Sequence, residues 1–139
     1  MEKIVCVSLY ADPLHVGHLE LLHKAKQLGD KLYVIVNNDE QAAMKKGKSF
    51  MPAKERVKVI RSLECVDAAI IACDKDRTVC ETIRLIHPNI FANGGDQTNE
   101  SIPEVEICRE LGIQLVDGLG AKIQSSSWLI EESKSISKR

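Results

Sequence analysis

Runs of apolar, mostly β-branched residues recur along the chain at intervals that suit a strand–helix repeat. The first is IVCVSL at residues 4–9, and the second is LYVIV at residues 32–36. Such runs, with few polar positions, are typical of strands buried on both faces of a sheet. The pattern predicts five strands, at residues 4–9, 32–36, 68–72, 90–92 and 113–116.

Residues at helical spacing separate these runs. Leu19, Leu22, Ala25 and Leu28 fall on one helical face, and Gly29 is expected to end that helix. Pro52 is expected to open the next helix. Helices are also predicted at residues 52–64, 79–86, 103–111 and 125–132. The polar, basic and glycine-containing residues 40–51 predict mostly loop.

This alternation predicts an α/β fold, specifically a Rossmann-like three-layer sandwich around a doubly wound, parallel, five-stranded sheet. A length of 139 residues fits one domain, residues 1–139, whose Ser- and Lys-rich end at about 133–139 is expected to fray. Ligands of such sheets bind beyond the carboxyl ends of the strands. The loops expected at that edge are residues 12–18, 37–48, 93–98 and 118–127, which predicts one composite site.

Two histidines stand where the first strand passes into the first helix. The segment DPLHVGH at residues 12–18 places His15 and His18 three residues apart, on one face of the first helical turn. A helix start also offers backbone N–H groups and the positive end of the helix dipole. Gly17, between the histidines, indicates close approach of a ligand or of another backbone segment. Together these features favour a site for a polyphosphate.

Other interpretations of the pair stay open at this point. Two histidines at this spacing are often an ordinary surface or core pair. They could also be two metal ligands, although a zinc site needs at least a third ligand and only Asp12 is nearby. The remaining histidines, His23 and His87, are interpreted as structural.

Composition excludes several classes of partner. A formal net charge of −1 gives no general attraction to nucleic acid or to a membrane surface, and no apolar stretch is long enough to span a bilayer. The short basic run at residues 45–48 could serve one anionic ligand. Five scattered cysteines without a C-x-x-C motif predict free, mostly buried thiols. With no signal peptide visible, we expect a cytoplasmic protein.

Several short motifs in a fixed order resemble the nucleotidyltransferase (cytidylyltransferase-like) family. The family's H-x-G-H signature is matched at residues 15–18, and its Ser/Thr-rich segment at the last helix is matched by QSSS at 124–127. Between them, matching segments lie at residues 36–39, 46–47, 55–56, 66–67 and 94–96. One departure is the first loop, where LYAD at residues 9–12 replaces the usual G-T-F-D.

The resemblance implies that a substrate phosphate attacks the α-phosphorus of a nucleoside triphosphate and that pyrophosphate leaves. His15 and His18 would donate hydrogen bonds to phosphate oxygens. Lys46 and Arg56 would grip the β- and γ-phosphates, with Arg56 as a bidentate donor. Each residue also has an ordinary structural interpretation; Arg56, for example, could pair with a nearby carboxylate.

The resemblance also implies a set of residues that contact the nucleotide or its phosphates. They are Tyr10, Ala11, Asp12, Gly17, Gly94, Gly95, Asp96, Ser125, Ser126 and Ser127. The serines would bring hydroxyls and helix-start N–H groups to the phosphates. The glycines would let the nucleoside approach the backbone, with Asp96 near the ribose or base. Asp12 and Asp39 are implied to contact the substrate that accepts the nucleotide.

The implied partners are a nucleoside triphosphate, with ATP favoured over CTP, and a phosphorylated small molecule such as a sugar phosphate. Mg²⁺ would be held mainly by the triphosphate itself. A homodimer is also implied. Within the family, the chain resembles heptose 1-phosphate adenylyltransferases, then glycerol-3-phosphate cytidylyltransferases, then archaeal FAD synthetases, which are FMN adenylyltransferases. Two hypotheses of other classes remain: a nucleotide sensor without catalysis, and a small metalloprotein that uses the two histidines.

Overall fold

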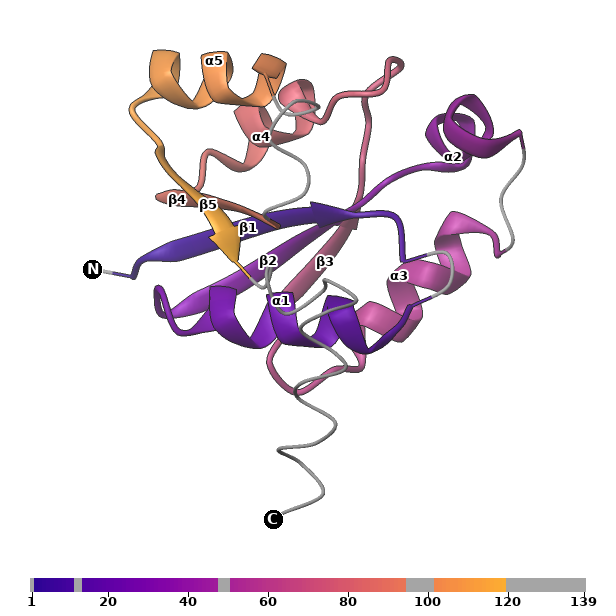
Figure 1. Ribbon diagram of the computed structural model, residues 1–139, viewed down its shortest axis with the longest axis horizontal. Coiled ribbons are helices and arrows are strands. Elements are labelled where there is room, and N and C mark those ends of the chain that lie inside the picture. The colour runs from indigo at the N-terminus through magenta and orange to yellow at the C-terminus, as the bar shows by residue number, and fades with distance from the viewer. Residues whose placement is uncertain (1, 12–13, 48–50, 95–101, 120–139) are drawn as a thin grey trace, which may run out of the picture.

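The computed structural model describes residues 2–11, 14–47, 51–94 and 102–119, and these form one parallel sheet covered by helices on both faces (Figure 1). The strands are β1 (Ile4–Leu9), β2 (Lys31–Val36), β3 (Ala68–Ile71), β4 (Ile90–Gly94) and β5 (Gln114–Leu119). The helices are α1 (Val16–Lys26), α2 (Asp39–Lys46), α3 (Ala53–Arg61), α4 (Cys80–Ile86) and α5 (Ile102–Leu111).

The strand order is β3-β2-β1-β4-β5, and every neighbouring pair is parallel. The chain therefore builds the sheet outward from β1 in one direction, returns across it, and continues with β4 and β5 in the other. The predicted doubly wound, five-stranded Rossmann-like sheet is confirmed. Its switch point lies between β1 and β4, where loops leaving the two strands diverge and a ligand crevice forms in such folds.

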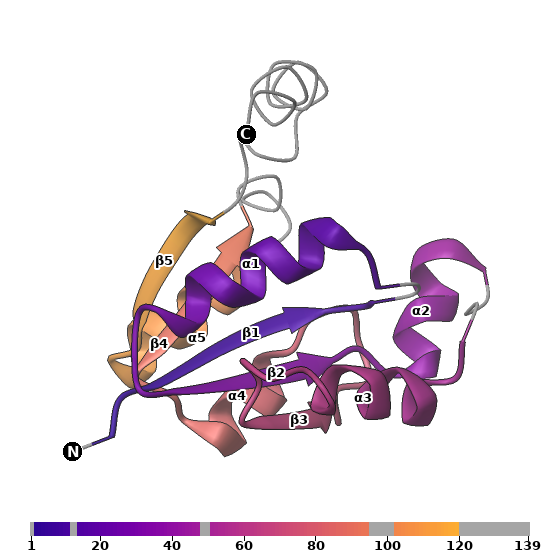
Figure 2. The ribbon, with the colours of Figure 1, turned by 90° about the horizontal axis from the view of Figure 1, so that it is seen from below.

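Two apolar cores, one on each face of the sheet, make the three layers. The first includes Leu22 and Ala25 of α1 with Val57 and Ile60 of α3. The second includes Ile83 of α4 and residues 107–108 of α5. Figure 1 shows α1 and α3 on one side of the strands and α4 and α5 on the other, and Figure 2, seen from below, shows α1 and α3 in front of the strands. Each of these four helices thus buries one apolar face, as its spacing of apolar residues predicts.

One predicted loop is a helix. Residues 40–51 were expected to be mostly loop, but α2 occupies Asp39–Lys46 at the carboxyl end of the sheet (Figure 1). Asn38 begins it as the N-cap. The Asn38 Oδ1 atom accepts from the Gln41 N–H at 2.8 Å, and Gln41 Oε1 accepts from the Asn38 N–H at 3.0 Å. This reciprocal capping satisfies two backbone donors and explains a helix without a strong apolar stripe.

Side-chain amides tie α2 to the segment that leads into α4. Gln41 is fully buried, and its amide nitrogen donates to the carbonyls of Asp76 and Thr78, both at 2.8 Å. Asn38 donates to the carbonyls of Ala72 and Asp74 at 3.0 and 2.9 Å. These bonds hold residues 72–78 beside α2, so both segments contribute to the same edge of the sheet.

The remaining helix ends follow local chemistry. Helix α3 ends at Arg61 rather than at residue 64. Helix α4 ends at Ile86, and its C-cap residue His87 takes the left-handed conformation (φ +48°) before Pro88. His87 therefore has the structural role expected of it. Gly29, after α1, is required by close packing: a Cβ atom there would lie 2.7 Å from the Lys3 carbonyl oxygen and from Val5 Cγ2.

The cysteines differ in burial. Cys6 and Cys108 are buried in the core beside α4 and α5, as expected, whereas Cys73 is exposed and Cys65 and Cys80 are half-buried. Burial raises the pKa of the Cys108 thiol to about 11 and raises that of Cys6 further. Both buried thiols are therefore protonated and act as apolar packing groups. No helix in the described part of the chain has the length and apolar character needed to cross a membrane.

Candidate active site

His15 and His18 cap the first turn of α1 with their own side chains. His15 is the N-cap residue, and its Nδ1 atom accepts a hydrogen bond from the Gly17 N–H at 3.1 Å. His18 Nδ1 in turn accepts from the His15 N–H, also at 3.1 Å. The two rings stack with centroids 3.9 Å apart and an angle of 28° between their planes. The spacing of the two histidines thus places both at a helix start, as predicted, and the structure shows in addition that their rings stack.

These hydrogen bonds fix which ring nitrogen carries the proton. An Nδ1 atom that accepts from an amide N–H cannot hold a proton itself, so each ring carries it on Nε2. Burial, the neighbouring His15 and the charge of Lys45 together lower the pKa of His18 to about 4. His18 is therefore a neutral ring near pH 7 with one N–H donor, Nε2–H, left for a ligand.

We predict that His18 makes the fold less stable as the pH falls from 6.5 towards 4. The unfolded ring takes up a proton near its ordinary pKa of 6.5, whereas the folded ring stays neutral until about pH 4, so the unfolded state binds the extra proton across this window. The stability that the neutral His18 ring contributes to the fold is complete above pH 6.5 and is lost on acidification. Urea unfolding of wild type and His18→Asn measures it.

Asn is the matched replacement because its side-chain oxygen can take the place of Nδ1 without titrating. Acidification should lower the free energy of unfolding of wild type more than that of His18→Asn. The slopes of this free energy against pH should differ by an amount equivalent to the binding of at most one proton. A difference between the two proteins that stays constant over the same pH range would contradict the lowered pKa.

Gly17 has a different role from the one expected. Gly17 is buried, and its backbone N–H donates to His15 Nδ1 instead of remaining available to a phosphate. The helix start is therefore satisfied internally by the histidine side chains. What it offers a ligand is the pair of Nε2–H groups rather than the Gly17 amide.

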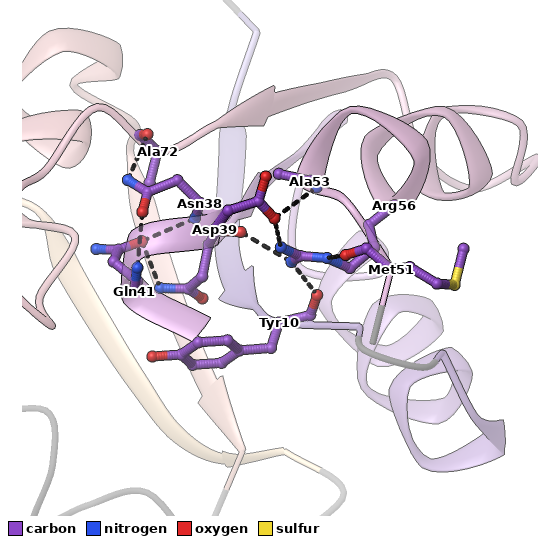
Figure 3. Close-up of polar contacts among 9 residues, drawn as sticks. Tyr10, Asn38, Asp39, Gln41, Met51, Ala53, Arg56 and Ala72 are labelled. Atoms are coloured by element: carbon purple, nitrogen blue, oxygen red, sulfur yellow. Dashed lines mark hydrogen bonds and ion pairs between the residues drawn. The ribbon is translucent and has the colours of Figure 1, made fainter. Parts of the chain in front are cut away.

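Arg56 of α3 is a buried clamp between three chain segments (Figure 3). Its Nε donates to the Met51 carbonyl at 2.8 Å, and Nη1 donates to the Tyr10 and Asn37 carbonyls at 2.7 and 2.8 Å. Its Nη2 donates to Asp39 Oδ1 at 3.1 Å.

The predicted bidentate grip of Arg56 on a triphosphate does not fit this placement. The side chain has no exposed surface, and four of the five N–H groups of a guanidinium are taken by protein acceptors. The structural interpretation, pairing with a carboxylate, is the one observed. Arg56 holds the ends of β1 and β2 in place instead of reaching the ligand.

Asp39 is the carboxylate of this clamp. Its Oδ1 accepts from the Ala53 N–H at 2.8 Å as well as from Arg56, so it supports the first turn of α3. Its side chain is nonetheless 55% exposed. The structure therefore gives Asp39 a positioning role, and its predicted contact with substrate stays a prediction.

A pocket of about 320 Å³ opens at the carboxyl edge of the sheet. It spans the switch point, because its walls come from the ends of β1, β2 and β4. Residues 77–79, which precede α4, form another side, and α2 and α5 add one side chain each. The polar and charged residues among its lining are Ser8, Tyr10, Asn37, Lys45, Arg77, Thr78, Asn93 and Glu104.

Lys45 links this pocket to the histidine pair. It lines the pocket, its Nζ lies 4.4 Å from the centroid of the Tyr10 ring, and its charge contributes to the lowered pKa of His18. Lys45 and Arg77 give the lining two cationic side chains against the single carboxylate of Glu104. The arrangement suits an anionic ligand that reaches from the pocket towards the histidines.

The backbone is strained at Ala11, where the sequence departs from the G-T-F-D pattern of the family that it resembles. Ala11 is buried and has a φ of +52°, in the left-handed region that non-glycine residues rarely adopt. Its neighbour Tyr10 places its carbonyl on Arg56 and lines the pocket. Tyr10 therefore lines the pocket and Ala11 turns the chain as it leaves β1, while their predicted contacts with nucleotide or phosphate stay predictions.

Several predicted residues lie outside the described parts of the chain: Asp12, Gly95, Asp96, Ser125, Ser126 and Ser127, as does the helix expected at residues 125–132. Gly94 is the last residue of β4 and Lys46 the last of α2, so both lie at the carboxyl edge of the sheet. Their roles stay predictions.

Sequence patterns alone did not single out Arg77, Thr78, Asn93 or Glu104. Lys45 was noticed only as part of a basic run. Arg77 and Thr78 belong to a segment without a motif of its own, and Glu104 looks like an ordinary first-turn helix residue. The predicted position of Asn93, after a strand and within a loop at the carboxyl edge, was the one available signal.

The described residues also bear on metal binding. Among residues 2–11, 14–47, 51–94 and 102–119, no three or more His, Cys, Asp or Glu side chains gather into a set that could hold a metal ion. His15 and His18 use Nδ1 for backbone hydrogen bonds. Binding of Mg²⁺ mainly through the triphosphate stays a prediction.

Comparison with known proteins places the chain in a family. A family model described as cytidylyltransferase-like matches residues 10–122. FAD synthase from Pyrococcus abyssi is 36% identical over 112 residues, which cover 80% of this chain and 75% of that protein. Bifunctional protein HldE from a Nitratiruptor species is 33% identical over 136 residues, covering 96% of this chain. The chain spans only about a quarter of the length of such HldE proteins (28% and 23% for two of them).

Solved structures give the same picture. A lipopolysaccharide core biosynthesis protein from Thermoplasma volcanium is similar with a TM-score of 0.72 and 29% identity, over 85% of this chain and 95% of that one. A pantoate-beta-alanine ligase from Francisella tularensis, at 15% identity and a TM-score of 0.59 over 84% of this chain and 58% of that one, shares the fold. The family match extends from the first loop, through the histidine pair and the pocket, to beyond the last strand. The chain therefore belongs to the cytidylyltransferase-like family of nucleotidyltransferases.

Proposed function

We propose that this chain transfers a nucleoside monophosphate from a nucleoside triphosphate to a phosphorylated small molecule and releases pyrophosphate. The observation that carries the proposal is the stacked histidine pair. Both Nδ1 atoms are used by the helix start, so two Nε2–H donors remain for a ligand beside a pocket with two cationic side chains. Donors held in this way stabilise charge that grows on phosphate oxygens, without reorganisation during the reaction.

In the proposed reaction, an oxygen of the acceptor phosphate forms a bond to the α-phosphorus. The bond from the α-phosphorus to the bridging oxygen of the β-phosphate breaks, and the electron pair leaves with pyrophosphate. His15 and His18 donate hydrogen bonds to phosphate oxygens as this charge develops, and no proton needs to leave either ring. Lys45 adds positive charge between the pair and the pocket. Positioning and electrostatic stabilisation supply most of the catalysis in such transfers.

Magnesium enters this proposal with the nucleotide. When bound, Mg²⁺ neutralises charge on the triphosphate and on the leaving pyrophosphate. Asp12 and the serines at residues 125–127 are proposed to contact the substrate, the hydrated ion or the phosphates, on the basis of the family motif. The described residues that line the pocket contribute hydrogen-bonding groups and cationic charge.

For the donor nucleotide we favour ATP, with CTP next, because the Lys46-Gly47 and Gly94-Gly95-Asp96 segments resemble those of heptose 1-phosphate adenylyltransferases. For the acceptor we favour a sugar phosphate. Glycerol 3-phosphate with CTP, and FMN with ATP, are the alternatives. The similarity to an FAD synthase supports the last of these. A nucleotide sensor without catalysis would bind a triphosphate but form no pyrophosphate.

We predict that the protein releases pyrophosphate when given Mg²⁺, the preferred triphosphate and a phosphorylated acceptor. A thermal-shift screen of ATP, CTP, GTP and UTP with Mg²⁺ identifies the base first, because a ligand that binds the folded state raises the apparent melting temperature. Pyrophosphate release is then measured with sugar phosphates, glycerol 3-phosphate and FMN. A melting shift without pyrophosphate from any acceptor would favour the sensor, and the absence of both would count against a nucleotide site.

A further inference from the structure

Glu104 is a buried acid on the wall of the pocket. It lies in the first turns of α5 and has a relative exposure of 7%. One carboxylate oxygen, Oε2, accepts from the Val79 N–H at 3.0 Å. The other, Oε1, is also buried, and among the described residues it has no hydrogen-bond partner.

An unpaired buried carboxylate oxygen is costly, and folded proteins contain few of them. Burial raises the pKa of Glu104, and the charges of Asp74 and Asp76 raise it further, against the hydrogen bond from Val79. The protein therefore maintains an acceptor that lacks a donor at the edge of a ligand-sized cavity. A ligand that brings a donor to Oε1 removes this cost and is favoured over one that does not.

We propose that Oε1 of Glu104 accepts a hydrogen bond from a hydroxyl group of the acceptor substrate, so that the pocket selects hydroxylated phosphate monoesters over their deoxy analogues. This inference rests on the proposed function for the identity of the pocket's ligand as a phosphorylated acceptor. It assigns to Glu104 a role in substrate selectivity, separate from the groups that contact the reacting phosphates.

The surroundings favour a hydroxyl over an ammonium group as the donor. Lys45 and Arg77 line the same pocket, in which Glu104 is the only carboxylate among the described lining residues. The other two acids whose charges act on Glu104, Asp74 and Asp76, lie outside that lining, so an ammonium group in the pocket would meet more cations than carboxylates. Both cations suit the phosphate of the acceptor instead. The other polar groups of the described lining are uncharged hydroxyl, phenol or amide side chains, so they add no charge that would favour an ammonium group: Ser8, Tyr10, Asn37, Thr78 and Asn93.

The test begins with the wild-type protein and matched ligands. Binding of 2-hydroxyethyl phosphate, ethyl phosphate and 2-aminoethyl phosphate is measured by titration calorimetry without nucleotide, as is binding of glycerol 3-phosphate and propyl phosphate. In at least one pair we expect the hydroxylated member to bind at least about 10-fold more tightly than its deoxy partner. This ratio corresponds to the free energy that a hydrogen bond to a charged group contributes. No preference in either pair, no binding by any ligand, or tighter binding of the ammonium ligand would overturn the inference.

The variant Glu104→Gln then assigns that preference to one residue. The Gln carbonyl can keep the bond to the Val79 N–H, so the fold is expected to survive, and thermal melting checks this. Glu106→Gln is the matched control, because Glu106 is exposed on the same helix. The preference should fall to within about threefold in Glu104→Gln and stay unchanged in Glu106→Gln. A preference retained by Glu104→Gln would overturn the inference.

The two proposals can fail separately. Pyrophosphate release with the same ligands and a triphosphate tests the reaction, whereas the binding ratios test Glu104. Selective binding with no pyrophosphate from any acceptor contradicts the proposed function and supports the role of Glu104. Turnover of hydroxylated and deoxy acceptors with equal kcat/KM supports the function and contradicts that role.

Discussion

Replacing His18 by Asn is expected to lower the turnover number by about 10²- to 10³-fold while the protein stays folded. The Asn side chain can supply the acceptor that His18 Nδ1 now offers to the His15 N–H, so the start of α1 keeps its cap. What it removes is Nε2–H, the donor that we assign to the phosphate. Steady-state pyrophosphate release at saturating substrates, with circular dichroism as the check on folding, measures the effect.

The complementary replacement by Gln separates capping from catalysis. A Gln amide nitrogen can reach the position of Nε2, so His18→Gln should keep more activity than His18→Asn while stabilising the helix start less well. His23→Asn is the control, because His23 is exposed on the same helix and outside the pair. Equal turnover in wild type and His18→Asn would refute the role of the pair. We expect the same order of effects at His15.

Replacing Arg56 by Met is expected to lower the free energy of unfolding by about 3–5 kcal/mol. The loss comes mainly from three backbone carbonyls, those of Tyr10, Asn37 and Met51, which would lose their charged donor. The ion pair with Asp39 adds less, because that carboxylate is 55% exposed. Urea unfolding monitored by circular dichroism measures the change.

The control for Arg56 lies further along the same helix, at its last residue. Arg61 is exposed and donates to a single carbonyl, that of Ala69, at 3.0 Å, so Arg61→Gln should cost about 1 kcal/mol or less. If Arg56 instead gripped phosphates, Arg56→Met would leave stability unchanged and affect only nucleotide binding. That result would contradict the clamp. Arg56→Lys should also be strongly destabilising, because one ammonium group cannot replace a guanidinium that spans four acceptors.

The sheet was predictable because its strands are nearly continuous apolar runs. Such runs at residues 4–9 and 32–36 have no helical periodicity, and five of them separated by helical patterns leave few topologies open. Helix α2 was missed for the opposite reason. Its sequence DEQAAMKK has no apolar stripe, and its stability depends on reciprocal capping by Asn38 and Gln41 and on the burial of Gln41. The Asn-x-x-Gln spacing was the signal that could have found it.

Part of the candidate site could likewise be predicted from the sequence, and part could not. The apolar run before residues 12–18 and the helical pattern after them predicted where His15 and His18 lie, at the start of α1, while their contact with phosphate stays a prediction. The order of motifs could not distinguish an Arg56 that reaches a ligand from one that holds carbonyls, since both uses require the same residue at the same position. Lys45, Arg77 and Glu104 come together only through the packing of α2, α4 and α5 at the sheet edge, and no local pattern records that meeting.

The most direct test of the central claim follows the fate of the α-phosphate. The preferred triphosphate, labelled at the α- or the γ-position, is incubated with Mg²⁺ and a phosphorylated acceptor, and the products are separated by chromatography. We predict that the α-label appears in a nucleotide-linked acceptor, that the γ-label appears only in pyrophosphate, and that His18→Asn slows both together. Transfer of the γ-label to the acceptor, or an α-label found only in free nucleotide, would contradict nucleotidyl transfer at this histidine pair.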